Sequence, residues 1–108
     1  MRELSGAGEP PPLTCAVVVE ELWRGSRPDE SDAISSLVGG IQIAPLGAAE
    51  GELAGIWRRE FASRGTTLSQ ADCLIAAAAV SAEARLATGN PRHFPMDELE
   101  LEHWPAGA

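Results

Sequence analysis

The sequence lacks long apolar runs and has few basic residues for its acidic content. None of its apolar stretches approaches the roughly 20 residues that a membrane-spanning helix needs, and residues 1–6 contain no apolar signal-peptide core. We therefore expect a cytoplasmic protein with no membrane segment. Eight Lys and Arg residues against sixteen Asp and Glu residues give a formal net charge of −8. This charge argues against broad, charge-driven binding of nucleic acid. It leaves open an enzyme that holds a phosphodiester through metal ions, and also a basic protein partner.

Cysteine is scarce, and the common motifs of catalysis and nucleotide binding are absent. Cys15 and Cys73 are single residues, far apart in sequence and in apolar contexts. This pattern favours buried free thiols over a disulfide or a metal pair. The sequence has no glycine-rich phosphate loop, no Cys/His zinc spacing and no nucleophile elbow, so it gives no support to a Ser-His-Asp triad.

The 108 residues, 44% of them hydrophobic, are enough for one small globular domain spanning residues 1–108. Apolar spacing and helix-stop residues predict helices over 17–24, 48–63 and 69–83. A further helix is predicted to begin at a cap on Asp29 or Ser31 and to end at Gly39. Short extended segments are predicted at 13–15, 41–44, 85–88 and 99–103. Single strands that alternate with helices indicate an α/β fold with a mostly parallel sheet. The chain starts with what resembles a helix end at 2–6 and a stiff proline run at 10–12, and no apolar strand precedes them.

Asp72 lies in the first turn of an otherwise apolar predicted helix. Ser69, three residues earlier, forms with it the pattern of a capping box. The helix dipole also favours an acid there by about 0.3–1 kcal/mol. The alternative is a metal ligand, because the strand that follows this helix ends in polar side chains. The two roles are compatible, since one carboxylate oxygen can cap the helix while the other faces a cleft.

Glu21 interrupts an apolar stripe. On a helix over 17–24, Val17, Val18, Glu21 and Leu22 share one side, whereas Glu20 points away. A buried carboxylate costs several kcal/mol unless it has a partner, and a metal ion is one such partner. The alternative is that the short helix is rotated and Glu21 is partly solvated.

Asn90 follows the predicted strand at 85–88. Open α/β sheets bind ligands beyond the carboxyl ends of their strands, where Thr88 and Asn90 offer neutral oxygens. The alternative is turn formation, which an Asn-Pro pair favours. His93 is either a surface loop residue or a group that contacts a metal ligand without binding the metal itself. Arg92 is a weak candidate for a phosphate contact.

Three blocks of sequence, in this order and spacing, resemble the PIN domain and most closely the VapC toxins of bacterial type II toxin–antitoxin systems. They are residues 18–25 (VVEELWRG), 68–76 (LSQADCLIA) and 86–94 (LATGNPRHF). Each block alone is degenerate, but the ordered set is fairly specific and covers nearly the whole chain.

The resemblance implies a parallel sheet sandwiched by helices and a Mg²⁺- or Mn²⁺-dependent endoribonuclease that hydrolyses phosphodiesters of RNA. The helix acid of the family falls on Glu21 and its mid-chain acid on Asp72, both as catalytic metal ligands. The polar position after the strand falls on Asn90, and His93 replaces an acid found in some members. The resemblance also implies a cognate antitoxin and a homodimer, and a basic antitoxin segment would suit the charge of −8.

The chain departs from the family at its start. PIN domains open with a central apolar strand that ends in a metal-binding Asp, and this sequence has no counterpart for it. The missing part is on the order of twenty residues by usual element lengths. A misassigned start codon or a truncated reading frame is our hypothesis for this departure. Because two carboxylates make a weak Mg²⁺ site, we expect weak activity or none.

A competing hypothesis is a non-catalytic α/β interaction module, or a decayed toxin, that binds an antitoxin-like partner. In that case Trp23, Trp57 and the acidic surface would make the protein contacts.

Overall fold

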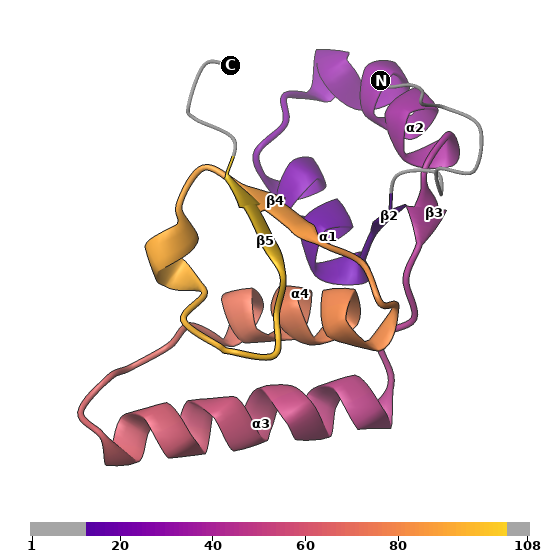
Figure 1. Ribbon diagram of the computed structural model, residues 1–108. Coiled ribbons are helices and arrows are strands. Elements are labelled where there is room, and N and C mark those ends of the chain that lie inside the picture. The colour runs from indigo at the N-terminus through magenta and orange to yellow at the C-terminus, as the bar shows by residue number, and fades with distance from the viewer. Residues whose placement is uncertain (1–12, 104–108) are drawn as a thin grey trace.

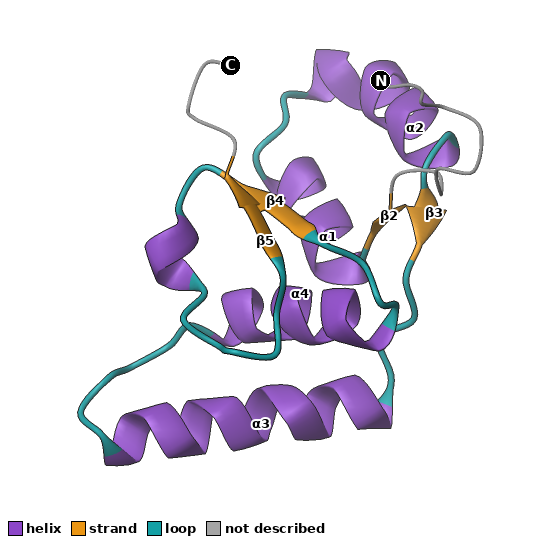
Figure 2. Cartoon of the chain, in the orientation of Figure 1, coloured by secondary structure: helices purple, strands orange, loops and turns teal. Residues whose placement is uncertain are grey.

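The computed structural model describes residues 13–103, in which four α-helices accompany two separate pairs of short parallel strands (Figure 1, Figure 2). Strand β2 (Leu13–Thr14) pairs with β3 (Gln42–Ile43), and β4 (Leu86–Thr88) pairs with β5 (Leu101–His103). Helix α4 lies below both pairs in Figure 1. The predicted α/β class with parallel strands is therefore confirmed.

The helices follow the predicted ranges closely. They are α1 (Ala16–Arg24), α2 (Ser31–Gly39), α3 (Ala48–Ser63) and α4 (Gln70–Ser81), with short 3₁₀ turns η1 (Pro28–Glu30) and η2 (Pro91–His93). The predicted cap of α2 at Asp29 or Ser31 is wrong: because η1 runs directly into α2, Glu30 takes the cap position and makes no side-chain cap bond. The strands at 42–43 and 101–103 are shorter than predicted. The predicted helix end at 2–6 lies outside the described residues.

The turn between α3 and α4 sets the position at which α4 begins. Gly65 adopts a left-handed conformation with φ of +87°, which glycine reaches without the steric penalty of a side chain. The N–H of Thr66 then donates to the carbonyl of Phe61 at 2.9 Å and closes the helix end. Arg58 Nε donates to the carbonyl of Leu68 at 3.4 Å, so α3 also holds the last residues of the turn.

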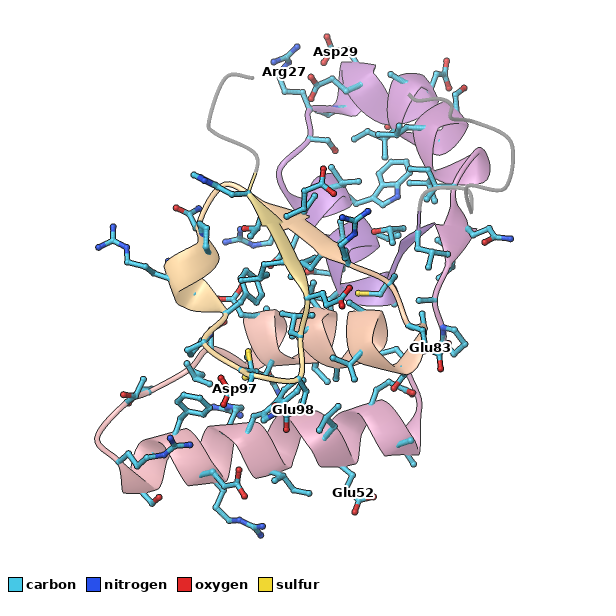
Figure 3. All side chains as sticks on the ribbon, in the orientation of Figure 1. Arg27, Asp29, Glu52, Glu83, Asp97 and Glu98 are labelled. Carbon is cyan, nitrogen blue, oxygen red and sulfur yellow. The ribbon has the colours of Figure 1, made fainter. Side chains whose placement is uncertain are left out.

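The main hydrophobic core lies between α3, α4 and the segment that leads to β5. Trp57 on α3 is 2% exposed and packs with Cys73, Ala76 and Ala77 on α4. The indole N–H of Trp57 donates to Glu98 Oε1 at 3.2 Å, and Figure 3 shows Glu98 between α3 and the chain above it. Burial of this indole contradicts the hypothesis that Trp57 contacts a partner protein, whereas Trp23 is 40% exposed.

A second, smaller core joins α1 to α4. Cys15, Ala44 and Ala78 are its buried members, and Val17, Val18 and Ile75 pack against them. Both cysteines are buried free thiols, as predicted. Burial raises the pKa of the Cys73 thiol, which keeps this thiol in its unreactive protonated form. Within residues 13–103, none of the helices combines the length and apolar character needed to cross a membrane.

Glu50 is a buried acid in the first turn of α3. Its Oε1 accepts a hydrogen bond of 2.7 Å from the N–H of Gly47. This bond, together with one from Ser81, holds the pKa of the Glu50 carboxyl below its ordinary value of 4.5. A lowered pKa in the folded state means that the carboxylate stabilises the fold above the unfolded pKa. That stabilisation is lost as the pH falls through the folded pKa.

We therefore expect the free energy of unfolding to fall less steeply below pH 4.5 in a Glu50→Gln variant than in the parent. Urea unfolding followed by circular dichroism, from neutral pH down to acid, measures this slope. Glu52→Gln is the matched control, because Glu52 is exposed on the same helix and Figure 3 shows it pointing away from the core. Equal slopes for the parent and Glu50→Gln would contradict the assignment.

Candidate metal centre

Asp72 sits at the start of α4, and its backbone and side chain have different partners. Its N–H donates to Ser69 Oγ at 3.0 Å, so the predicted N-cap at Ser69 is confirmed. Its carboxylate lies beside η2, where Oδ2 is 3.5 Å from His93 Nδ1. Among the described residues, no return bond from the Asp72 carboxylate to the Ser69 backbone accompanies the cap. The capping explanation therefore accounts for the backbone of Asp72 and leaves its carboxylate available for another role.

The pocket around Asp72 has a lining of mixed polar and apolar residues. It encloses about 780 Å³ including its open mouth. The Asp72 side chain is 27% exposed in it. Its walls come from the α3–α4 turn, the start of α4 and η2: Phe61, Thr66, Thr67, Leu68, Ser69, Asp72, Arg92, His93 and Pro95. Within residues 13–103, the pocket thus presents the Asp72 carboxylate, the His93 imidazole, the Arg92 guanidinium and hydroxyl groups to a solute.

The η2 turn brings His93 to Asp72. Pro91 begins the turn, and the N–H of His93 donates to the carbonyl of Asn90 at 3.0 Å. Phe94 follows and is buried in the main core, which anchors the turn on α4. The sequence allows two interpretations of His93, a surface loop residue or a residue that contacts a metal ligand. In the structure His93 is an exposed residue that contacts Asp72, and the signal for this contact in the sequence is the family resemblance, in which His93 replaces an acid.

Asn90 lies outside the Asp72 pocket. It is exposed, and its backbone N–H donates to Thr88 Oγ1 at 3.0 Å. This bond is a local turn in which the Thr88 hydroxyl is the acceptor. The role of Asn90 at a metal site stays a prediction.

Glu21 is exposed on α1 and is absent from the pocket lining. The expectation that its side chain occupies the buried stripe is wrong, because Val17, Val18 and Leu22 are only partly buried and α1 has no fully buried residue. The alternative interpretation, a solvated Glu21, is the one observed. The structure therefore does not gather Glu21, Asp72 and Asn90 in one pocket.

The residues in the pocket fit a divalent cation only in part. Asp72 and His93 offer an oxygen and a nitrogen ligand, a pair that suits Mn²⁺ better than Mg²⁺, which prefers oxygen ligands throughout. Within residues 13–103, no group of three His, Cys, Asp or Glu side chains is arranged to hold a metal ion. The pair therefore provides an incomplete ligand set.

No protein-family model matches the sequence, and no curated protein sequence matches it either. The likeness is to solved structures. VapBC2 from Rickettsia felis bound to a DNA fragment from their promoter is 27% identical with a TM-score of 0.71, covering 83% of this chain and 72% of the other. VapBC-1 from nontypeable Haemophilus influenzae is 22% identical with a TM-score of 0.79, covering 94% and 82%. DNA-bound VapBC from Salmonella typhimurium is 22% identical with a TM-score of 0.75, covering 85% and 74%.

These likenesses define the class of the fold. Four helices with short parallel strands, matched over more than four fifths of the chain by each structure, make a PIN-like α/β domain. Because all three are VapBC structures, the chain has a VapC-like PIN-domain fold. The resemblance that the three sequence blocks indicate is confirmed at the level of the fold.

Proposed function

We propose that this protein is the toxin-type member of a VapBC-like pair, a single domain over residues 1–108 related to ribonucleases that hydrolyse RNA with Mg²⁺ or Mn²⁺. The observation that carries the proposal is the VapC-like fold, in which the carboxylate of Asp72 lines a pocket beside His93. The fold comparisons support a toxin–antitoxin protein, and the chemistry of the pocket supports the nuclease assignment.

The residues of this chain suggest how such a pocket would bind and hydrolyse RNA. Asp72 would hold the cation, and Glu21 and Asn90 are the further groups that the family resemblance implies. A bound cation would lower the pKa of a water and neutralise phosphate charge. Arg92 lines the same pocket and carries a planar guanidinium that suits phosphate oxygens. Ser69 fixes the first turn of α4 and with it the position of Asp72.

We expect this chain to cleave RNA weakly or not at all, because two side chains make an incomplete cation site. The test is an RNA-hairpin cleavage assay with Mn²⁺ and with Mg²⁺, run beside Asp72→Asn and the charge-matched control Glu52→Gln. Little cleavage by the parent is the expected result. Strong cleavage that Asp72→Asn abolishes and Glu52→Gln retains would overturn the expectation of weak activity and establish the nuclease. Strong cleavage that both variants retain would assign the activity to another protein in the preparation.

We also propose a basic antitoxin segment as the partner and a homodimer as the assembly. The three structural neighbours are VapBC proteins, and the net charge of −8 complements a basic chain.

A second candidate function is a non-catalytic interaction module. It is favoured by large apolar side chains exposed on the N-terminal half: Leu13, Trp23, Leu37 and Ile43. The two candidates differ at Asp72, because only the nuclease requires that residue to bind a cation.

A further inference from the structure

Arginine is unevenly distributed along this acidic chain. The sequence has no lysine, so its eight basic residues are all arginines. Residues 58–72 and 91–96, which contain the lining of the Asp72 pocket, carry four of these eight arginines and only two of the sixteen acids. The pocket therefore lies in a locally basic part of a chain whose net charge is −8. A cleft of locally positive charge attracts anions even when the whole protein repels them.

Three of these arginines reach the wall of the pocket, and all three are exposed. Arg92 lines it directly. Arg58 Nε donates to the carbonyl of Leu68, a lining residue, at 3.4 Å. The guanidinium carbon of Arg64 lies 4.4 Å from the ring centroid of Phe61, another lining residue. In the part of the chain that the structure describes, no ion pair joins an acid to any of the three, so their charges are available to an anion.

Phe61 and Arg64 together supply a flat, cationic surface at the pocket wall. Phe61 is only partly buried, where it packs against the main core. Arg64 Nε donates to the carbonyl of Glu60 at 3.4 Å, which holds the guanidinium at the end of α3. Aromatic rings and guanidinium planes are the groups on which proteins stack unpaired bases. A base inside a duplex already stacks on its neighbours, so this surface favours an unpaired nucleotide.

The pocket has the size and the polar groups for a nucleotide. Its volume of about 780 Å³, mouth included, lies within the range of ~300–1,000 Å³ that is typical of small-molecule pockets. The α3–α4 turn adds hydroxyl groups to its wall. Arg92 directly precedes His93, whose Nδ1 is 3.5 Å from the Asp72 carboxylate. A phosphate held by Arg92 would therefore lie close to the carboxylate that the proposed cation needs.

We propose that Phe61, Arg64 and Arg92 hold an unpaired nucleotide of the RNA substrate. The base stacks on the Phe61–Arg64 pair, and an adjacent phosphate binds Arg92, so the strand crosses the pocket beside Asp72. The three are positioning residues, because they bind and orient the strand and take no part in the hydrolysis. The inference rests on the proposed function for the identity of the strand as RNA, but it requires neither a bound cation nor cleavage.

Binding of fluorescent oligonucleotides, followed by anisotropy in the presence of EDTA, tests the proposal apart from the nuclease. The ligands are a short unstructured RNA strand and an abasic strand of the same length and charge. The parent should bind the RNA strand about tenfold more tightly, which is the usual order of one base–aromatic stack. Equal binding of the two strands, or no binding of the RNA strand at millimolar concentration, would overturn the proposal.

The preference for an unpaired strand is tested by competition. An unlabelled RNA duplex of the same length should displace the labelled strand less well than the unlabelled single strand does. Equal displacement by the two competitors would also overturn the proposal. Binding with these preferences but without cleavage would support this inference and count against the nuclease. Cleavage without any preference for the base would do the reverse.

Phe61→Leu removes the stacking ring and keeps apolar volume against the core. This variant should bind the RNA strand about tenfold more weakly than the parent, and no more tightly than it binds the abasic strand. An undiminished preference for the RNA strand in Phe61→Leu would overturn the proposal. If circular dichroism shows that the variant does not fold, the comparison of the two strands on the parent decides the stacking.

The salt dependence of binding separates a phosphate contact from a structural role. Each phosphate contact on a single strand contributes roughly 0.7 to the slope of log affinity against log salt concentration. Arg92→Gln should reduce the slope by about that amount. Arg24→Gln is the matched control, because Arg24 is exposed on α1 and absent from the pocket lining, and it should leave the slope unchanged. An unchanged slope in Arg92→Gln, or an equal reduction in Arg24→Gln, would refute the phosphate contact.

Discussion

Replacing Trp57 with alanine is expected to lower the free energy of unfolding by about 3–5 kcal/mol, the usual cost of deleting a large buried aromatic side chain. Trp57 is 2% exposed and joins α3 to α4 at the centre of the main core. The substitution also removes the hydrogen bond to Glu98. Because small domains have a total stability of only ~5–15 kcal/mol, the variant should be largely unfolded at moderate urea concentrations.

Urea unfolding followed by far-ultraviolet circular dichroism measures this loss without relying on tryptophan fluorescence. Trp23→Ala is the matched control, because Trp23 is the same residue type at 40% exposure. It should cost less, since 40% of its surface already contacts water, against 2% for Trp57. If the two variants lost the same stability, the assignment of Trp57 as the core anchor would be wrong.

Replacing Asp72 with asparagine is expected to weaken Mn²⁺ binding by at least about tenfold, or ~1.4 kcal/mol. Among the described residues, the carboxylate is the only acid in the pocket lining, and its loss leaves the His93 imidazole, the Arg92 guanidinium and neutral oxygens. Paramagnetic broadening of amide resonances by Mn²⁺ measures the affinity and locates the ion even when binding is weak. In the parent, the amides of Asp72, Cys73 and His93 should broaden first.

Two comparisons make the Asp72 result specific. Glu52→Gln removes the same charge far from the pocket and should leave the broadening unchanged. His93→Ala should weaken binding less than Asp72→Asn, because a neutral ligand contributes less attraction to a dication than a carboxylate does. Broadening that begins elsewhere on the chain, or that survives Asp72→Asn at full strength, would remove the support for a cation at this pocket.

Most of the local structure follows from short-range patterns. The helix over 48–63 is marked by apolar residues at helical spacing and by Gly65 after it, so its predicted range matches α3 (Ala48–Ser63). Ser69 predicts the start of α4 because a serine hydroxyl accepts a backbone N–H at a helix start. The sequence predicts a strand over 99–103 where β5 covers only 101–103, because alternation does not reveal which residues have a partner strand.

The sequence predicts the chemical groups of the candidate site, but only part of their arrangement in space. The sequence identifies Asp72 as a carboxylate near the polar end of a strand, and in the structure Asp72 lines a pocket with Arg92 and His93. The η2 turn brings His93 next to Asp72, and this contact is a tertiary one. Glu21 was expected on a buried stripe from helical spacing. Val17 and Val18 of that stripe do pack against the smaller core, but the covered part of α1 does not reach Glu21, which is exposed.

The sequence by itself determined the α/β class, the helix ranges, the free thiols and the resemblance to VapC-like PIN domains, because each rests on nearby residues or on their order. Only the tertiary structure decided that Trp57 is a core residue, that Glu21 is solvated and that Asp72 faces His93. It also decided that Arg92 and the Phe61–Arg64 pair meet at the Asp72 pocket. These properties depend on which elements meet in space, and helix or strand periodicity contains no information on the partner that covers a given face.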